Sequence, residues 1–156
     1  MKQKMGRTVA VTVVLIVILI LVMLLNSMVF VQGPYLREKD LFYRAHEQVM
    51  EQMRAREGEL VNRYVLDEIT YISKIRSLSR DWIVWYDEQG KVKEQVDVTS
   101  IDVERALEIA HQMGIDNDKV SYGWINERPA LLFEDRDREI LLDVKTLDVL
   151  LNFEKR

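Results

Sequence analysis

The chain has 156 residues, no cysteine and a formal net charge of −4. Without cysteine it has no disulfides, no thiolate metal ligands and no cysteine nucleophile. Acidic residues outnumber basic ones, 26 to 22, and the basic residues form no stripe, which argues against nucleic acid as a partner.

An uncharged apolar segment near the N-terminus, Thr8–Val31, comes first in the chain. It has 24 residues, and about 20 apolar helical residues span a bilayer core. Lys2, Lys4 and Arg7 precede it and no acidic residue does, so the positive-inside rule places residues 1–7 in the cytoplasm. A cleaved signal peptide is the alternative, but its apolar region is only about 7 to 15 residues long. We therefore predict an uncleaved single-pass anchor in the cell membrane and an extracytoplasmic C-terminal domain.

The first predicted unit of the exported part covers residues 35–98. A helix is expected from about Leu36 to Arg63, because apolar residues as far as Leu60 recur at the helical period, and Gly58 weakens its last turn. About three strands are expected after it, in residues 69–75, 82–86 and 91–98, with a turn at residues 87–90.

The second predicted unit, residues 99–156, repeats this pattern. Thr99 and Asp102 form a helix-start motif, with Ser100 as an alternative cap, and Gly114 ends the helix. Three or four strands follow, and alternation in the last one involves Leu147, Val149, Leu151 and Phe153. Because the links between strands are short, we expect antiparallel hairpins. The predicted class is α+β: one transmembrane helix followed by two tandem small helix-plus-antiparallel-sheet units.

Two motifs of the second unit resemble the PepSY-type domain family, a small cystatin-like fold. Its helix pattern T-x-x-E-A-x-x-I-A is matched by Ala106, Ile109 and Ala110, with Glu104 one residue before the position of the family's glutamate. Its strand-pair pattern V-D-x-x-T-G-x-(I/V/L)-L is matched by Leu142, Asp143, Thr146, Val149 and Leu150. Leu147 replaces the family's glycine, which disfavours the usual tight turn. Ala106, Ala110, Asp143 and Thr146 are expected to be structural, with the Asp143 carboxylate accepting backbone N–H bonds.

The wider order of elements resembles the TseB-like cell-wall elongation regulator family. That order is an anchor, a helix, a short sheet with the segment Ile83-Val84-Trp85, and a PepSY-like unit. The resemblance implies a non-enzymatic extracytoplasmic regulator or adaptor that binds a penicillin-binding transpeptidase during cell-wall elongation. One alternative is an inhibitor of an exported peptidase, because PepSY units also occur in protease propeptides. Another is a bitopic structural protein of the division or elongation machinery.

The sequence contains no pattern typical of catalysis. His46 and His111 are the only histidines, and each stands alone beside an apolar helical stripe. No nucleophile elbow or glycine-rich phosphate loop is present. The acidic residues of segment 134–139 alternate with Arg136 and Arg138, which is typical of a solvated hairpin. We predict no enzymatic activity, no metal and no cofactor.

The aromatic segment 81–87 is the best binding candidate. Strand alternation directs Trp82, Val84 and Tyr86 to one face, and Ile83 and Trp85 to the other. Since both faces are apolar, one covers the helix, and the other either packs on the neighbouring unit or forms a docking patch. With two aromatic residues of the second unit that extend either surface, the candidate partner-binding patch comprises Trp82, Val84, Tyr86, Tyr122 and Trp124.

Overall fold

A computed structural model of the chain describes residues 2–27, 33–66 and 68–155, with helical side chains described in 12–27 and from residue 39 onward. Internal contacts divide the chain into two compact units, Met1–Leu41 and Phe42–Arg156. Both predicted helix-and-sheet units fall largely in the second of these, and their boundaries at residues 35–98 and 99–156 stay a prediction.

Helix α1, Lys2–Ser27, contains most of the predicted anchor. Its large apolar side chains from Val13 to Leu25 are each between 47% and 67% exposed. Residues 28–31 of the predicted anchor lie outside the described residues. Among the residues that the structure does describe, no helix combines the length and the hydropathy needed to cross a membrane.

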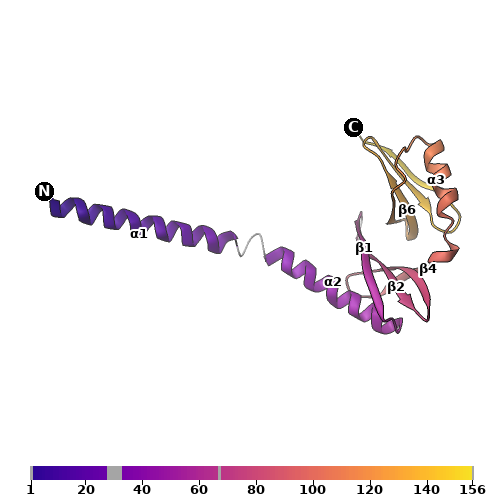
Figure 1. Ribbon diagram of the computed structural model, residues 1–156, viewed down its shortest axis with the longest axis horizontal. Helices are drawn as coiled ribbons and strands as arrows, with labels where there is room; N and C mark the ends of the chain where they lie inside the picture. The colour runs from indigo at the N-terminus through magenta and orange to yellow at the C-terminus, as the bar shows by residue number, and fades with distance from the viewer. Residues whose placement is uncertain (1, 28–32, 67, 156) are drawn as a thin grey trace. The chain divides into compact units, whose positions relative to one another are not determined.

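Helix α2, Gly33–Gln52, leads into the first four-stranded antiparallel sheet (Figure 1). The strands follow the chain order across the sheet: β1 Glu57–Val65, β2 Ile69–Ser77, β3 Arg80–Tyr86 and β4 Val92–Asp97. The expected turn at residues 87–90 is confirmed: the Asp87 carboxylate accepts hydrogen bonds from the Gln89 and Lys91 amides, both at 2.9 Å.

The predicted helix as far as Arg63 was wrong, because α2 ends at Gln52 and Leu60 lies in β1. The helix stops where Arg54 adopts a left-handed backbone, φ 49°, and the Ala55 amide donates to the Met50 carbonyl at 2.9 Å. Gly58 serves the strand instead: a Cβ there would lie 2.5 Å from the Met50 sulfur, so a larger residue would have to displace the end of the Met50 side chain.

The second half contains helix α3, Val103–Gln112, on one face of another four-stranded antiparallel sheet (Figure 1). Its strands are also in chain order: β5 Val120–Ile125, β6 Arg128–Glu134, β7 Arg138–Asp143 and β8 Val149–Glu154. The α+β class is confirmed, and the first sheet has one strand more than the three expected.

Two predicted positions in this half need correction. Helix α3 is capped by Asp102, whose carboxylate accepts the Arg105 amide at 3.0 Å, whereas Thr99 and Ser100 belong to a preceding 3₁₀ turn, η2 Val98–Ser100. Leu147 is not in a strand: with φ 61° it closes a tight turn, and its amide donates to the Asp143 carbonyl at 2.9 Å. The turn forms without glycine because the Leu147 side chain packs against the core.

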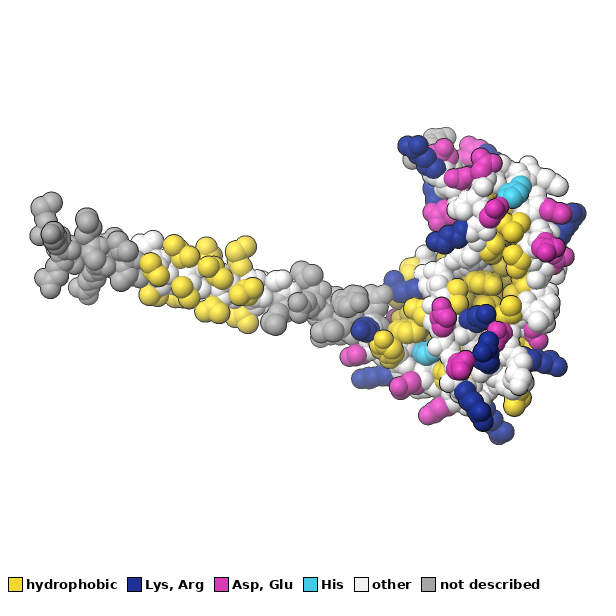
Figure 2. Space-filling view, in the orientation of Figure 1, with side chains coloured by type: hydrophobic (Ala, Val, Ile, Leu, Met, Phe, Trp, Pro, Cys, Tyr) yellow, Lys and Arg dark blue, Asp and Glu magenta, His cyan; other side chains and the backbone are white. Residues whose placement is uncertain are grey.

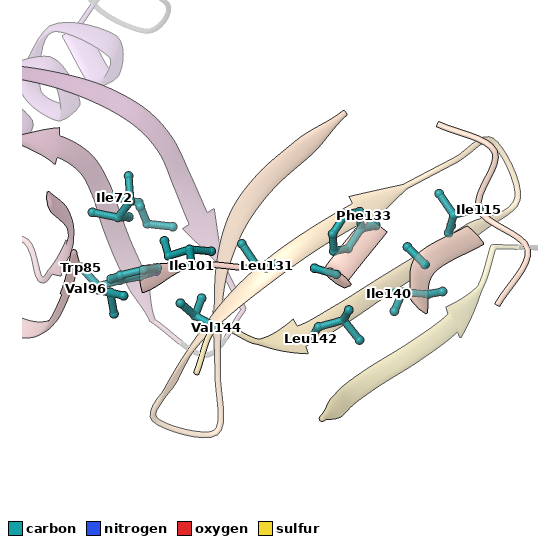
Figure 3. Packing of buried hydrophobic residues seen from close by; sticks show 13 residues of the cluster. Ile72, Trp85, Val96, Ile101, Ile115, Leu131, Phe133, Ile140, Leu142 and Val144 are labelled. Carbon is teal, nitrogen blue, oxygen red and sulfur yellow. The ribbon is translucent and has the colours of Figure 1, made fainter. Parts of the chain in front are cut away.

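One apolar core joins the two sheets (Figure 3). From the first sheet come Ile72, Ile83, Trp85 and Val96. From the second come Leu131, Phe133, Ile140 and Leu142, with Ile101 and Val144 near the junction. Ala106 and Ala110 of α3 are buried in the same core. Burial of this shared core resists movement of one sheet against the other, since separating them would return large apolar surfaces to water.

Candidate interaction surface

The aromatic strand β3 alternates as predicted. Trp82, Val84 and Tyr86 pack with Ala45 and Val49 of α2, and Val84 and Tyr86 are fully buried. These two predicted patch residues therefore lie in the core under α2 and not at a surface of the chain.

The opposite face of β3 packs on the second half of the molecule through Trp85. This side chain is fully buried, and its indole Nε1 donates to the Gly123 carbonyl at 2.8 Å. Its ring meets Tyr122 edge to face, with centroids 5.9 Å apart. A salt bridge of 2.8 Å between Lys145 Nζ and Glu94 Oε2 also joins the two halves. Of the two possibilities for the second face, intramolecular packing is therefore the one that accounts for Trp85.

The five predicted patch residues do not come together. Tyr122 and Trp124 pack with the shared core on the Trp85 side of the sheet, whereas Trp82 packs on the α2 side. All three are half-buried. Of the five predicted patch residues, these three retain surface for a partner. Their role in binding stays a prediction.

His46 is a member of a polar network beneath α2. Its Nδ1 lies 3.1 Å from the Tyr86 hydroxyl and 3.3 Å from the Ser73 hydroxyl, and these two hydroxyls are 2.8 Å apart. The Phe42 ring stacks on the imidazole, with centroids 5.3 Å apart. Burial lowers the pKa of His46 and raises the pKa of Tyr86, so both groups are neutral at neutral pH. The network holds α2 on the sheet, with Ser73 fully buried and His46 half-buried.

The remaining predicted polar residues are structural or lie at the surface. Asp143, 6% exposed, accepts the Lys145 amide at 2.8 Å and the Thr146 amide at 3.1 Å, as predicted. Thr146 in turn donates its hydroxyl to Asp148 at 2.7 Å. His111 lies 2.9 Å from the exposed Asp118 carboxylate. Among the described residues, no three metal-ligating side chains form a group.

Several exposed apolar residues were missed by the sequence analysis. Figure 2 shows hydrophobic side chains gathered across the middle of the compact unit. Leu78, at the tip of the β2–β3 hairpin, is 90% exposed. The other large apolar side chains exposed in the two sheets and their loops, among the described residues, are Leu60, Val61, Val65, Leu66, Val149 and Phe153. The exposed residues of β1 were missed because the predicted helix extended into this strand. Leu78 was missed because it belongs to no periodic pattern.

One hollow combines exposed apolar residues with a predicted patch residue, and we call it the Trp124 hollow. It has a volume of about 410 Å³ and is lined by Leu66, Glu68, Trp124, Ile125, Asn126 and Glu127. Leu66 and Glu68 follow β1, and the other residues belong to the end of β5 and the turn after it. The lining thus combines apolar side chains, which we call its floor, with the carboxylates of Glu68 and Glu127, which we call its border.

Lys93 shows how this region holds a cation. Its Nζ lies 5.3 Å from the centroid of the Trp124 ring, 2.5 Å from Glu68 Oε1 and 2.9 Å from the Thr70 hydroxyl. The Lys93 side chain is 13% exposed. An ammonium group is attracted to an indole face by the ring quadrupole and to a carboxylate by charge. Lys93 does not line the hollow, but it shows that Trp124 and Glu68 together hold an ammonium next to it.

The turn between β5 and β6 holds Glu127 in an unfavourable backbone conformation. Asn126 and Glu127 have φ of 50° and 60°, the geometry of a two-residue turn whose second position usually carries glycine. Asparagine tolerates this region, but a glutamate there is strained. Backbone strain of this kind concentrates at functional sites.

Comparison of the chain with models of protein families, with curated proteins and with solved structures finds no match.

Proposed function

We propose that this protein is a membrane-anchored, extracytoplasmic adaptor without catalytic activity, which binds and regulates a penicillin-binding transpeptidase in cell-wall elongation. The anchor is the uncharged segment Thr8–Val31, and the resemblance to the TseB-like family supplies the class of partner. Tethering confines both proteins to one membrane, so that a weak interface suffices.

The observation that carries the proposal is the combination of a firmly joined two-sheet body with large apolar side chains left in solvent. Trp85 and the shared core join the sheets, so the body can present its surface in a fixed arrangement. Leu66 is 53% exposed, Leu78 90% and Phe153 54%. Exposed apolar side chains on a rigid scaffold are the ordinary basis of protein docking.

In-cell photo-crosslinking tests the proposal. A photoreactive residue would replace Leu66, Leu78 or Phe153 in the full chain, one at a time, and adducts would be identified by mass spectrometry. Arg136 is the control position, because it is exposed and lies in a charged turn. A transpeptidase captured from at least one apolar position and not from Arg136 is expected.

Other adducts would replace the proposal. An exported peptidase captured at these positions would favour the inhibitor alternative, and a second copy of this chain would favour the bitopic structural protein. No adduct from any apolar position, with the variants present at normal levels in the membrane, would contradict the adaptor function.

A further inference from the structure

We infer that the Trp124 hollow is a docking site for a protein segment that presents a lysine or arginine side chain between apolar residues. The inference rests on the proposed function in one respect, because it takes the occupant to be a partner protein. It adds the chemistry of recognition and the residues that perform it.

The floor of the hollow favours an apolar group. Leu66 is 53% exposed and Trp124 is half-buried, so both keep surface that a partner would remove from water. Tryptophan is among the residues that concentrate binding energy at interfaces, particularly where surrounding contacts exclude water. A volume of about 410 Å³ accommodates one or two side chains.

The border of the hollow favours a cation. Glu68 and Glu127 contribute two negative charges, and Lys93 offsets one of them through its contact with Glu68. The Glu127 carboxylate is therefore the charge of the described lining side chains that Lys93 does not offset. A basic side chain beside apolar neighbours complements both the charge and the floor, whereas an acidic side chain would be repelled.

The alternative is that Glu127 is one of many surface charges of an acidic domain and has no specific role in the hollow. The exported part carries a net charge of −7, so a basic peptide is attracted to it in any case. The test therefore needs a matched variant that removes the same charge elsewhere. Glu104 is suitable, because it is an exposed glutamate in the first turn of α3 and does not line the hollow.

The test uses the full chain in nanodiscs of zwitterionic lipid, labelled with 5-fluorotryptophan and observed by ¹⁹F NMR. The chain has three tryptophans, and a Trp124→Phe variant assigns the Trp124 resonance by its disappearance. The probes are two hexapeptides, acetyl-Ser-Leu-Lys-Leu-Ser-Gly-amide and the same peptide with glutamate in place of lysine.

The lysine peptide should shift the Trp124 resonance saturably and leave Trp82 unmoved, and the glutamate peptide should bind at least fivefold more weakly. Glu127→Gln and Leu66→Ser should each weaken the lysine peptide at least threefold, whereas Glu104→Gln should not. Equal response to both peptides, equal effects of Glu127→Gln and Glu104→Gln, or an unmoved Trp124 resonance would overturn the inference.

A second measurement separates a binding role of Glu127 from a structural one. Glu127→Gly relieves the strained backbone, so the urea midpoint of unfolding should rise while the lysine peptide binds less tightly. If that variant were both less stable and weaker in binding, Glu127 would be a structural residue. If the peptides behave as expected but crosslinking captures no transpeptidase, the proposed function fails and the docking chemistry stands. The reverse result would place the transpeptidase interface elsewhere.

Discussion

Trp85→Phe tests whether one buried indole joins the two halves of the protein. The substitution removes the Nε1 donor and leaves the buried Gly123 carbonyl without that hydrogen bond, which costs about 1 to 3 kcal/mol. The smaller ring also gives up apolar contact in a fully buried position, for a further 1 kcal/mol or so. We expect a total loss of about 3 kcal/mol, a large fraction of the roughly 5 to 15 kcal/mol that stabilises a typical domain.

Urea unfolding of the full chain in nanodiscs, followed by tryptophan fluorescence, measures this loss. All three tryptophans lie in Phe42–Arg156, so helix α1 contributes no signal. With a urea dependence of about 1 to 3 kcal/mol per molar, the midpoint should fall by about 1 to 3 M. Trp82→Phe is the control, because Trp82 is half-buried on the α2 side, and it should cost less than about 1 kcal/mol. A loss for Trp85→Phe no larger than that of the control would refute the joining role.

Four further substitutions probe individual contacts by the same unfolding assay. Glu127→Gly should stabilise by about 0.5 to 1 kcal/mol, since glycine adopts φ 60° without strain, and a lower midpoint would contradict this. Leu78→Asn should also stabilise slightly, because Leu78 has φ 50° and is 90% exposed, so that no packing is lost; destabilisation would mean that Leu78 makes a contact in the folded chain. Asp143→Ala should cost about 1 to 2 kcal/mol by removing the acceptor of two turn amides, whereas an unchanged midpoint would show that the turn forms without it. Burial lowers the pKa of His46 in the folded state below its usual 6.5, so the unfolded chain binds the proton first and stability should fall as the pH is lowered through that value. His46→Gln should reduce this pH dependence, and an unaltered pH profile would exclude His46 as its source.

Local sequence patterns determined most of the secondary structure. The alternation of β3, the turn at residues 87–90 and the end of α3 just before Gly114 follow from side-chain period and backbone preference, which neighbouring residues carry by themselves. The structural role of Asp143 was predictable for the same reason, because its hydrogen bonds reach only two and three residues along the chain.

Contacts between distant residues decided the rest. The end of α2 and the place of Gly58 depend on how closely β1 passes Met50. The helical spacing of apolar residues continues beyond Gln52, so the sequence did not indicate this end. Leu147 tolerates a left-handed backbone because its side chain packs against the core, which no local preference indicates. The sequence showed that both faces of the aromatic strand are apolar. Only the tertiary structure could assign Tyr86 to α2, Trp85 to the second sheet and Trp124 to an open hollow, because burial depends on which distant segment covers each face.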